Sequence, residues 1–348
     1  MPFSLPFFGN ASVVSALEEM SARGRMAQTI LLSGPQGIGK ATLARRFAAS
    51  LLGDHADADA QKIELDDLSL DSNQQLILDR EKWTAEKRNE DPLQFASHPD
   101  FLSFAPDGPL RQLTISQMRL LKDRARLQPL KGRWRVFLID EIDRANEQAA
   151  NSLLKTLEEP PAHLILLMTA RNPYDLLPTI RSRAVPFRLT RLSDEEMRAF
   201  AKVRGLDQAE RRLRLAEGAP GAAVSLDLET YDRRRDAMLA LLKVASGLDP
   251  FSAWMKHSDS IAARRTEKLE EYLQVLCILL EDTLRLANRV GPLRNDDIRA
   301  QLEPLAQRVD FAWLRAAVQR SDELLVLGRR NIQKALALDA FATTLRAR

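Results

Sequence analysis

The spacing of hydrophobic residues divides the chain into a mixed first part and a second part in which only helical spacing is found. Up to residue 191, short apolar runs alternate with segments whose hydrophobic residues recur every three or four positions. The predicted strands are 29–32, 101–104, 134–139 and 164–169. The predicted helices are 10–22, 41–52, 116–127 with Ser116 as its cap, and a segment from about 146 to 159. This alternation favours a parallel sheet covered by helices on both faces.

The strand pattern ends after residue 191. Ser193 and Glu196 have the spacing of a capping box, which predicts the first turn of a helix. Glycine and proline predict a turn at 218–221, and long helices are expected at 269–286, 311–327 and 332–345. We therefore predict three parts: an α/β domain at residues 1–191, a small all-helical domain at 192–238 and a larger all-helical domain at 239–348.

Residues 54–97 separate the second predicted helix from the second predicted strand. The stretch is acidic at its start, mixed in charge later, and shows little strand pattern. We interpret it as an insertion that is partly mobile. It contains no cysteine, and the single cysteine of the chain, Cys277, lies in an apolar helical run where we expect it to be buried.

Composition and charge leave the choice of partner open. The 51 Lys and Arg residues nearly balance the 48 Asp and Glu residues, so no large one-sided field indicates nucleic acid. Residues 1–10 contain no Lys or Arg, unlike a signal peptide, and no apolar run reaches the ~18 residues of a membrane span. We therefore expect a cytoplasmic protein without a membrane partner.

A glycine-rich loop follows the first predicted strand and opens the next helix. It contains Gly34, Gly37, Gly39 and Lys40 in the order GPQGIGK. In this context the backbone N–H groups of the loop and of the helix N-terminus face phosphate oxygens, and the lysine neutralises them. The sequence therefore predicts a P-loop with these four residues as nucleotide-binding groups.

The residue after the lysine departs from the P-loop pattern. The pattern requires Ser or Thr there, because that hydroxyl binds the magnesium ion of the nucleotide, but this chain has Ala41. Thr42 is rotated by about 100° along the helix and does not replace it. The sequence therefore argues against a magnesium site, while binding of ATP or ADP stays open.

Two carboxylates follow the apolar strand 134–139. In a Walker B arrangement, Asp140 holds magnesium and Glu141 orients the attacking water. Acids also follow buried strands simply to cap the next helix. The P-loop about 100 residues earlier favours the first interpretation, so Asp140 is a candidate nucleotide-binding residue and Glu141 a candidate catalytic one.

Three segments resemble the AAA+ subunits of bacterial DNA polymerase III clamp loaders. They are NSLLKTLEEPP at 151–161, LPTIRSR at 177–183 and RNIQKALALD at 330–339. The resemblance implies an AAA+ α/β domain, a helical lid domain and a helical C-terminal collar domain. It also implies a hetero-pentameric ring with gamma/tau and delta subunits, a sliding clamp and primed-template DNA as partners. No polymerase site is implied.

Within this resemblance, Arg183 matches the arginine finger that such subunits present to the nucleotide of a neighbour. A planar, always charged guanidinium suits the charge of a transferring phosphoryl group. The competing interpretation is a surface arginine in an ion pair. The match is incomplete, since Ala184 stands where the family has cysteine.

Other positions also depart from the motor-type subunits. Arg171 stands where they carry a polar sensor residue, and the run 218–221 lacks their sensor arginine. The four-cysteine zinc module of many relatives has no counterpart in 54–97, so no zinc is expected. Three functions remain: a non-hydrolysing ring member, a self-sufficient AAA+ ATPase of the gamma/tau or DNA-remodelling kind, and a scaffold without a finger.

Overall fold

The computed structural model describes residues 7–52, 56–264, 267–328 and 333–346. Its contacts group the chain into two compact units, one formed by residues 1–207 and 216–225 and the other by 208–215 and 226–348. Helix α12 (Leu228–Ala245) runs without interruption through the predicted boundary at 238/239. The division into three domains stays a prediction.

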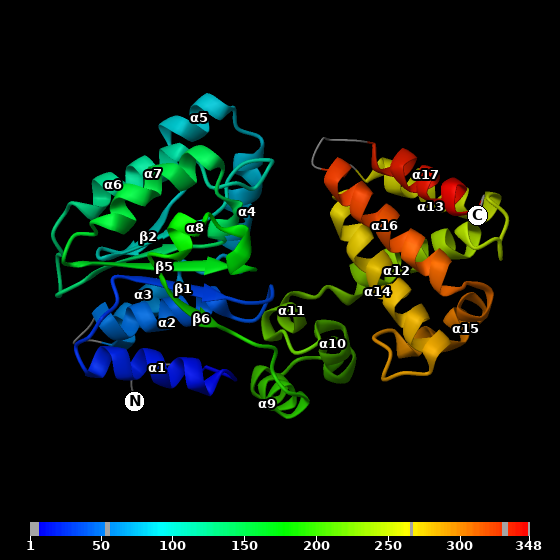
Figure 1. The fold of residues 1–348 in the computed structure, drawn as a ribbon, viewed down its shortest axis with the longest axis horizontal. Coiled ribbons are helices and arrows are strands. Elements are labelled where there is room, and N and C mark those ends of the chain that lie inside the picture. The colour runs from blue at the N-terminus through cyan, green and yellow to red at the C-terminus, as the bar shows by residue number, and fades with distance from the viewer. Residues whose placement is uncertain (1–6, 53–55, 265–266, 329–332, 347–348) are drawn as a thin grey trace. The chain divides into compact units, whose positions relative to one another are not determined.

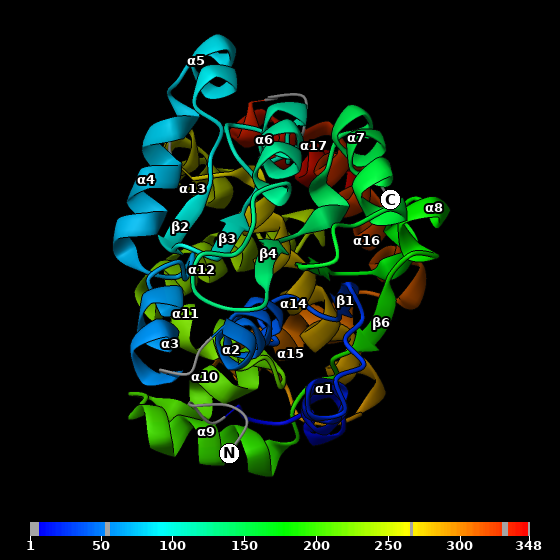
Figure 2. The same cartoon turned by 90° about the vertical axis from the view of Figure 1, so that its left-hand side faces the viewer.

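The first unit is built on a six-stranded sheet. Its strands are β1 (Thr29–Ser33), β2 (Phe95–His98), β3 (Phe101–Phe104), β4 (Arg135–Ile139), β5 (Leu164–Ala170) and β6 (Val185–Arg188). They lie in the order β2-β3-β4-β5-β1-β6. Figure 2 shows β2 and β6 at opposite edges of the sheet. All neighbours are parallel except β2, which is antiparallel to β3. The predicted parallel α/β fold is confirmed.

Helices cover both faces of this sheet. Figure 1 shows α6 (Ile115–Ala125) and α7 (Glu147–Glu158) on one face, and α1 (Ala11–Ala22) and α2 (Lys40–Leu52) on the other. Every residue of β1, β4 and β5 is buried, as their apolar sequences require. The unit also contains η1 (Ile142–Arg144), η2 (Pro173–Asp175), α8 (Pro178–Arg181), α9 (Asp194–Arg204) and α11 (Pro220–Ser225).

The two edge strands were not predicted from the sequence. β6 contains Pro186 and is mostly exposed, and proline is tolerated only at the edge of a sheet because it cannot donate to the ladder. The predicted cap of α6 was also wrong. Thr114, not Ser116, accepts the backbone N–H of Gln117 and forms a capping box with it. The predicted capping box of Ser193 and Glu196 at the start of α9 is confirmed.

The described part of the predicted insertion is mainly helical, and these helices were not predicted from the sequence. It contains α3 (Ala56–Glu64), α4 (Asp71–Glu81) and α5 (Ala85–Glu90), and it ends in β2. Buried arginines attach these helices to the sheet domain. Arg45 of α2 forms ion pairs with Glu64 and Asp67, and Arg80 of α4 with Asp107 at 2.7 Å. Ion pairs between residues far apart in the chain cannot be predicted from the spacing of hydrophobic residues.

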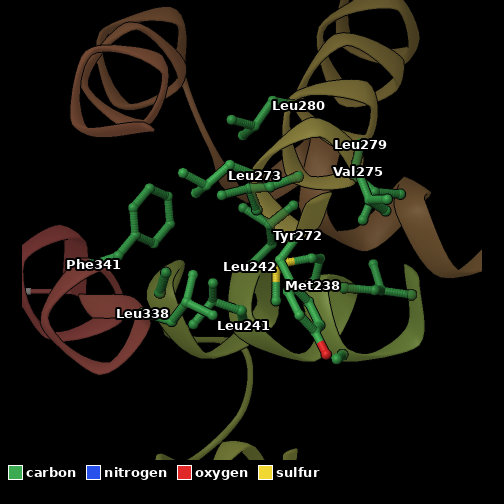
Figure 3. Packing of buried hydrophobic residues seen from close by; sticks show 14 of the residues in the cluster. Met238, Leu241, Leu242, Tyr272, Leu273, Val275, Leu279, Leu280, Leu338 and Phe341 are labelled. Carbon is green, nitrogen blue, oxygen red and sulfur yellow. The ribbon is translucent and has the colours of Figure 1, made fainter. Parts of the chain in front are cut away.

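The second unit is all-helical, as predicted. Besides α12 it contains most of α10 (Ala209–Ala216), α13 (Ser252–Ala263), α14 (Leu269–Asn288), η3 (Asp296–Ile298), α15 (Arg299–Arg308), α16 (Phe311–Gly328) and α17 (Lys334–Arg346). Figure 3 shows side chains of α12, α14 and α17 meeting in its core, among them Leu242, Leu273 and Phe341. Cys277 of α14 is half-buried rather than buried. Of the resemblance segment 330–339, residues 330–332 lie outside the described residues.

Among the helices that the structure describes, none combines the length and the hydropathy that a membrane crossing requires.

The buried Arg80–Asp107 pair provides a stability test. Replacing Arg80 by alanine leaves the Asp107 carboxylate buried without its partner, and we expect the free energy of unfolding to fall by about 3 kcal/mol. Urea unfolding measures the change. The control is Lys82→Ala, whose solvent-exposed pair with Asp79 should contribute little to stability. Equal effects of the two substitutions would contradict this account of how the insertion is held.

Candidate nucleotide site

The glycine-rich loop connects the end of β1 to the start of α2. Gly34 has a φ of 147° and Gly37 a φ of 75°, which residues with a side chain rarely adopt. A Cβ atom at Gly34 would lie 2.4 Å from the carbonyl oxygen of Leu189. Gly39 also has a positive φ, and α2 begins at Lys40. The strand, loop and helix order predicted for a P-loop is therefore present.

The Lys40 side chain folds back onto its own loop. Its Nζ donates to the carbonyl oxygens of Gly34 and Pro35, each at 2.8 Å, and the residue is 9% exposed. Burial lowers the pKa of the Lys40 ammonium, and the nearby carboxylates of Asp140 and Glu141 oppose that shift. The ammonium is therefore held within the loop by two neutral acceptors.

Asp140 and Glu141 follow β4 at the carboxyl edge of the sheet. The Thr169 hydroxyl at the end of β5 donates to Asp140 Oδ1 at 2.5 Å and accepts the Glu141 N–H at 2.9 Å. Burial raises the pKa of the Asp140 carboxyl, and the hydrogen bond from Thr169 acts in the opposite direction. Thr169, which the sequence did not single out, thus fixes both acids relative to β5.

The Glu141 carboxylate is paired with arginines. Glu141 has a φ of 50°, and its Oε2 lies 2.6 Å from Arg144 Nε. Arg171, the residue directly after β5, places its Nη2 4.0 Å from the other carboxylate oxygen. A carboxylate engaged in this way has less freedom to accept a proton from, or to orient, a water molecule.

Ala41 is the second residue of α2, and its methyl group offers no ligand for a metal. Among the described residues, no group of three or more His, Cys, Asp or Glu side chains is arranged to hold a metal ion. The absence of a hydroxyl at residue 41 thus stays the main argument against magnesium-assisted hydrolysis.

The helix α11 packs directly on the P-loop through backbone atoms. Gly221 N donates to Gly37 O at 2.8 Å. A Cβ atom at Gly221 would lie 2.9 Å from that oxygen, and one at Gly37 would lie 2.9 Å from the backbone nitrogen of Ala222. The sequence showed Gly221 only as part of a run without an arginine. The structure gives it a role of its own, because only glycine fits at this contact.

Arg183 lies just after α8 and is bound by residues outside the glycine-rich loop and the paired acids. Its Nη2 donates to Glu158 Oε1 at 2.8 Å, its Nη1 donates to Thr179 O at 2.9 Å, and a third of its side chain is exposed. The ion pair named above as a competing interpretation is therefore present in the single chain.

These features define the class of the protein. A glycine-rich loop after β1, paired acids after β4 and a parallel sheet between helices form the arrangement of a P-loop α/β domain. The chain belongs to the family described as "DNA polymerase III, delta subunit", whose sequence model matches residues 9–193.

Related proteins carry the names of several subunits of that polymerase. A DNA polymerase III subunit delta' of Pseudomonas aeruginosa is 28% identical over 262 residues, which are 74% of this chain and 64% of the relative. A subunit gamma of Buchnera aphidicola is 30% identical over 194 residues, 56% of this chain and 47% of the relative. A subunit gamma/tau of Mycobacterium tuberculosis is 34% identical over 195 residues, 55% of this chain and 29% of the relative. The chain spans about half the length, or less, of these gamma-type relatives.

Solved structures show similarity of fold at low sequence identity. A DNA polymerase III gamma subunit-related protein of Thermotoga maritima is 16% identical, with a TM-score of 0.46, and the match covers 95% of this chain and 99% of that protein. The RuvB Holliday junction branch migration motor of Thermotoga maritima is 20% identical, with a TM-score of 0.40, and the match covers 68% of this chain and 65% of that protein.

The contact between Gly37 and Gly221 predicts the effect of a single methyl group. Gly221→Ala places a Cβ against the Gly37 carbonyl, so we expect the free energy of unfolding to fall by about 1–3 kcal/mol and α11 to become accessible to protease. Thermal unfolding and limited proteolysis measure the two effects. Gly132→Ala is the control, because a Cβ there would meet only Leu52 O at an ordinary 3.6 Å. An unchanged Gly221→Ala variant would contradict the close packing.

Proposed function

We propose that this chain acts as the delta-prime subunit of a DNA polymerase III clamp loader. In this role it does not hydrolyse ATP itself but presents Arg183 to the ATP of a neighbouring subunit. The observation that carries the proposal is the contrast between two parts of one unit. The loop and paired acids lack a metal ligand at Ala41, and Glu141 is ion-paired with arginines. Arg183 instead donates to residues outside the loop and the acids, and a third of its side chain is exposed.

The extent of similarity supports delta-prime over gamma. The delta' relative matches 74% of this chain, whereas the gamma and gamma/tau relatives match 56% and 55%. The match to delta' is longer than the predicted α/β part of 191 residues, so it includes some of the helical part. The substitutions at residues 41, 171 and 221 point in the same direction.

A guanidinium is suited to act in trans. Its charge is permanent, and its planar set of N–H donors can bind several phosphoryl oxygens at once. Removing one such finger lowers phosphoryl transfer by roughly 10³–10⁵-fold in P-loop enzymes. Arg183 would stabilise charge that develops on a nucleotide held by another chain, whereas Gly34, Gly37, Gly39 and Lys40 would hold the phosphates of any nucleotide bound by this chain.

The helical unit would join the ring. Phe311, Val318 and Val326 of α16 are 70%, 43% and 62% exposed. Their spacing of seven and eight residues places them along one face of the helix. An exposed apolar stripe of this kind is suited to contact helices of other subunits. We infer a collar with gamma/tau and delta subunits, in an assembly that loads the sliding clamp on primed DNA.

The alternative is an ATPase active on its own, of the gamma/tau or DNA-remodelling kind. Lys40, Asp140 and Glu141 are all present, and the loop has its expected backbone form, which favours that alternative. Ala41 and the pairing of Glu141 with Arg144 argue against it. Turnover by the isolated chain separates the two functions.

The purified chain alone should release no phosphate from ATP above background, with or without primed DNA. The reason is the absence of a magnesium ligand after Lys40 together with a carboxylate that is not available to orient water. A phosphate-release assay measures the rate. Turnover that persists in Lys40→Ala is contamination, whereas DNA-stimulated turnover that Lys40→Ala abolishes would support the ATPase alternative.

Arg183→Ala should reduce hydrolysis in the reconstituted loader. At the ATP site that faces this chain, we expect a loss of about 10³-fold, and Arg183→Lys should recover little because an ammonium lacks the planar donor set. The measurement is single-turnover ATP hydrolysis. The P-loop lysine is replaced in the other ATPase subunits, so that hydrolysis is measured only at the site that faces this chain.

The control for this experiment is Arg23→Ala, an exposed arginine of the same domain that forms an ion pair with Glu19 of the preceding helix α1. It should leave the rate unchanged. Full activity of Arg183→Ala would leave only the scaffold function for this chain.

A further inference from the structure

We propose that Glu158 is a positioning residue for Arg183, and that it holds the guanidinium ready for a neighbour's phosphate before the ring assembles. The inference rests on the proposed function, since it adds a residue that positions the proposed arginine finger. The carboxylate acts through Arg183 and does not itself touch nucleotide.

Two separate elements fix the guanidinium. Glu158 is the last residue of α7, and its Oε1 accepts Arg183 Nη2 at 2.8 Å. The carbonyl oxygen of Thr179 in α8 accepts Nη1 at 2.9 Å, and the Ser182 hydroxyl lies 3.5 Å from the same nitrogen. Acceptors on both terminal nitrogens restrain the plane of the group as well as its location.

The restrained group still has donors to offer. A guanidinium carries five N–H bonds, and these contacts use only part of them. A third of the side chain is exposed. An arginine held in one rotamer loses less conformational freedom on binding a phosphate than a free one does, so holding it in advance favours binding and correct geometry.

Glu158 lies at the C-terminal end of α7, where the helix itself does not favour an acidic residue. An acid in the last turn faces the negative end of the helix dipole, which is locally unfavourable. Lys155 is the basic residue of that turn, and its cation is not the partner of Glu158. The neighbouring Glu159 carries the same charge at the same helix end, but its carboxylate has no ion pair or hydrogen bond among the described residues. Of the two acids, Glu158 is the one that forms an ion pair with Arg183.

The pair is easily altered without loss of the fold. Glu158 is half exposed, and ion pairs at such sites contribute little to stability. Glu158→Gln keeps the size of the side chain and removes its charge. Glu159→Gln is the matched control, one residue away with the same chemistry.

The experiment measures ATP hydrolysis by the reconstituted loader under the single-site conditions described for Arg183. Glu158→Gln should lower kcat by about tenfold, with KM for ATP unchanged, because the geometry of the finger and not the binding of nucleotide is altered. Glu159→Gln should have no effect. In an Arg183→Ala background, Glu158→Gln should have no further effect, since the two residues act as one unit.

Three results would overturn the proposal. A higher kcat for Glu158→Gln would show that the carboxylate competes with the phosphate. If Glu158→Gln lowers kcat by the same factor in the Arg183→Ala background, Glu158 does not act through Arg183. If Glu159→Gln lowers kcat as much as Glu158→Gln does, the effect is due to the local negative charge and not to the ion pair. If Arg183→Ala alone has no effect, the proposed function fails, whatever Glu158 does.

Discussion

The parallel pairing of β1 with β5, and of β5 with β4, is the constraint on which the candidate site depends. It brings the carboxyl ends of three strands to one edge of the sheet, so that the loop after β1, the acids after β4 and Arg171 after β5 lie close together. The Thr169 hydroxyl then joins two of these strand ends, through Asp140 and the Glu141 backbone. The apolar strands supply the scaffold, and the polar residues directly after them supply the chemistry.

At that edge the charged side chains already have partners within the chain. Lys40 is bound by its own loop, Glu141 by Arg144, and Asp140 by a hydroxyl, while α11 lies on Gly37 through a backbone contact. Arg183 differs, because its contacts with Glu158, Thr179 and Ser182 use only part of its N–H donors and a third of its side chain is exposed. This difference is the physical basis for the proposal that the chain acts on a neighbour's nucleotide and not on its own.

Much of the fold and the loop could be predicted because each is encoded locally. The apolar strands, the GPQGIGK loop and the acids after β4 are visible in short windows of sequence. The edge strands β2 and β6 were missed because they are short and partly exposed. The helices of the insertion were missed because buried arginine ion pairs, together with a few buried apolar residues such as Ile63 and Ile77, attach them. The contact of Gly221 with Gly37 and the pairing of Glu158 with Arg183 join residues far apart in the chain, and no spacing rule reports them.

The most direct test of the central claim is a structure of the assembled loader with a non-hydrolysable ATP analogue. The account predicts that the Arg183 guanidinium lies within hydrogen-bonding distance, about 3 Å, of the γ-phosphate bound by the adjoining subunit. Arg183 facing bulk solvent, or lying far from every neighbouring nucleotide in a fully assembled ring, would contradict it.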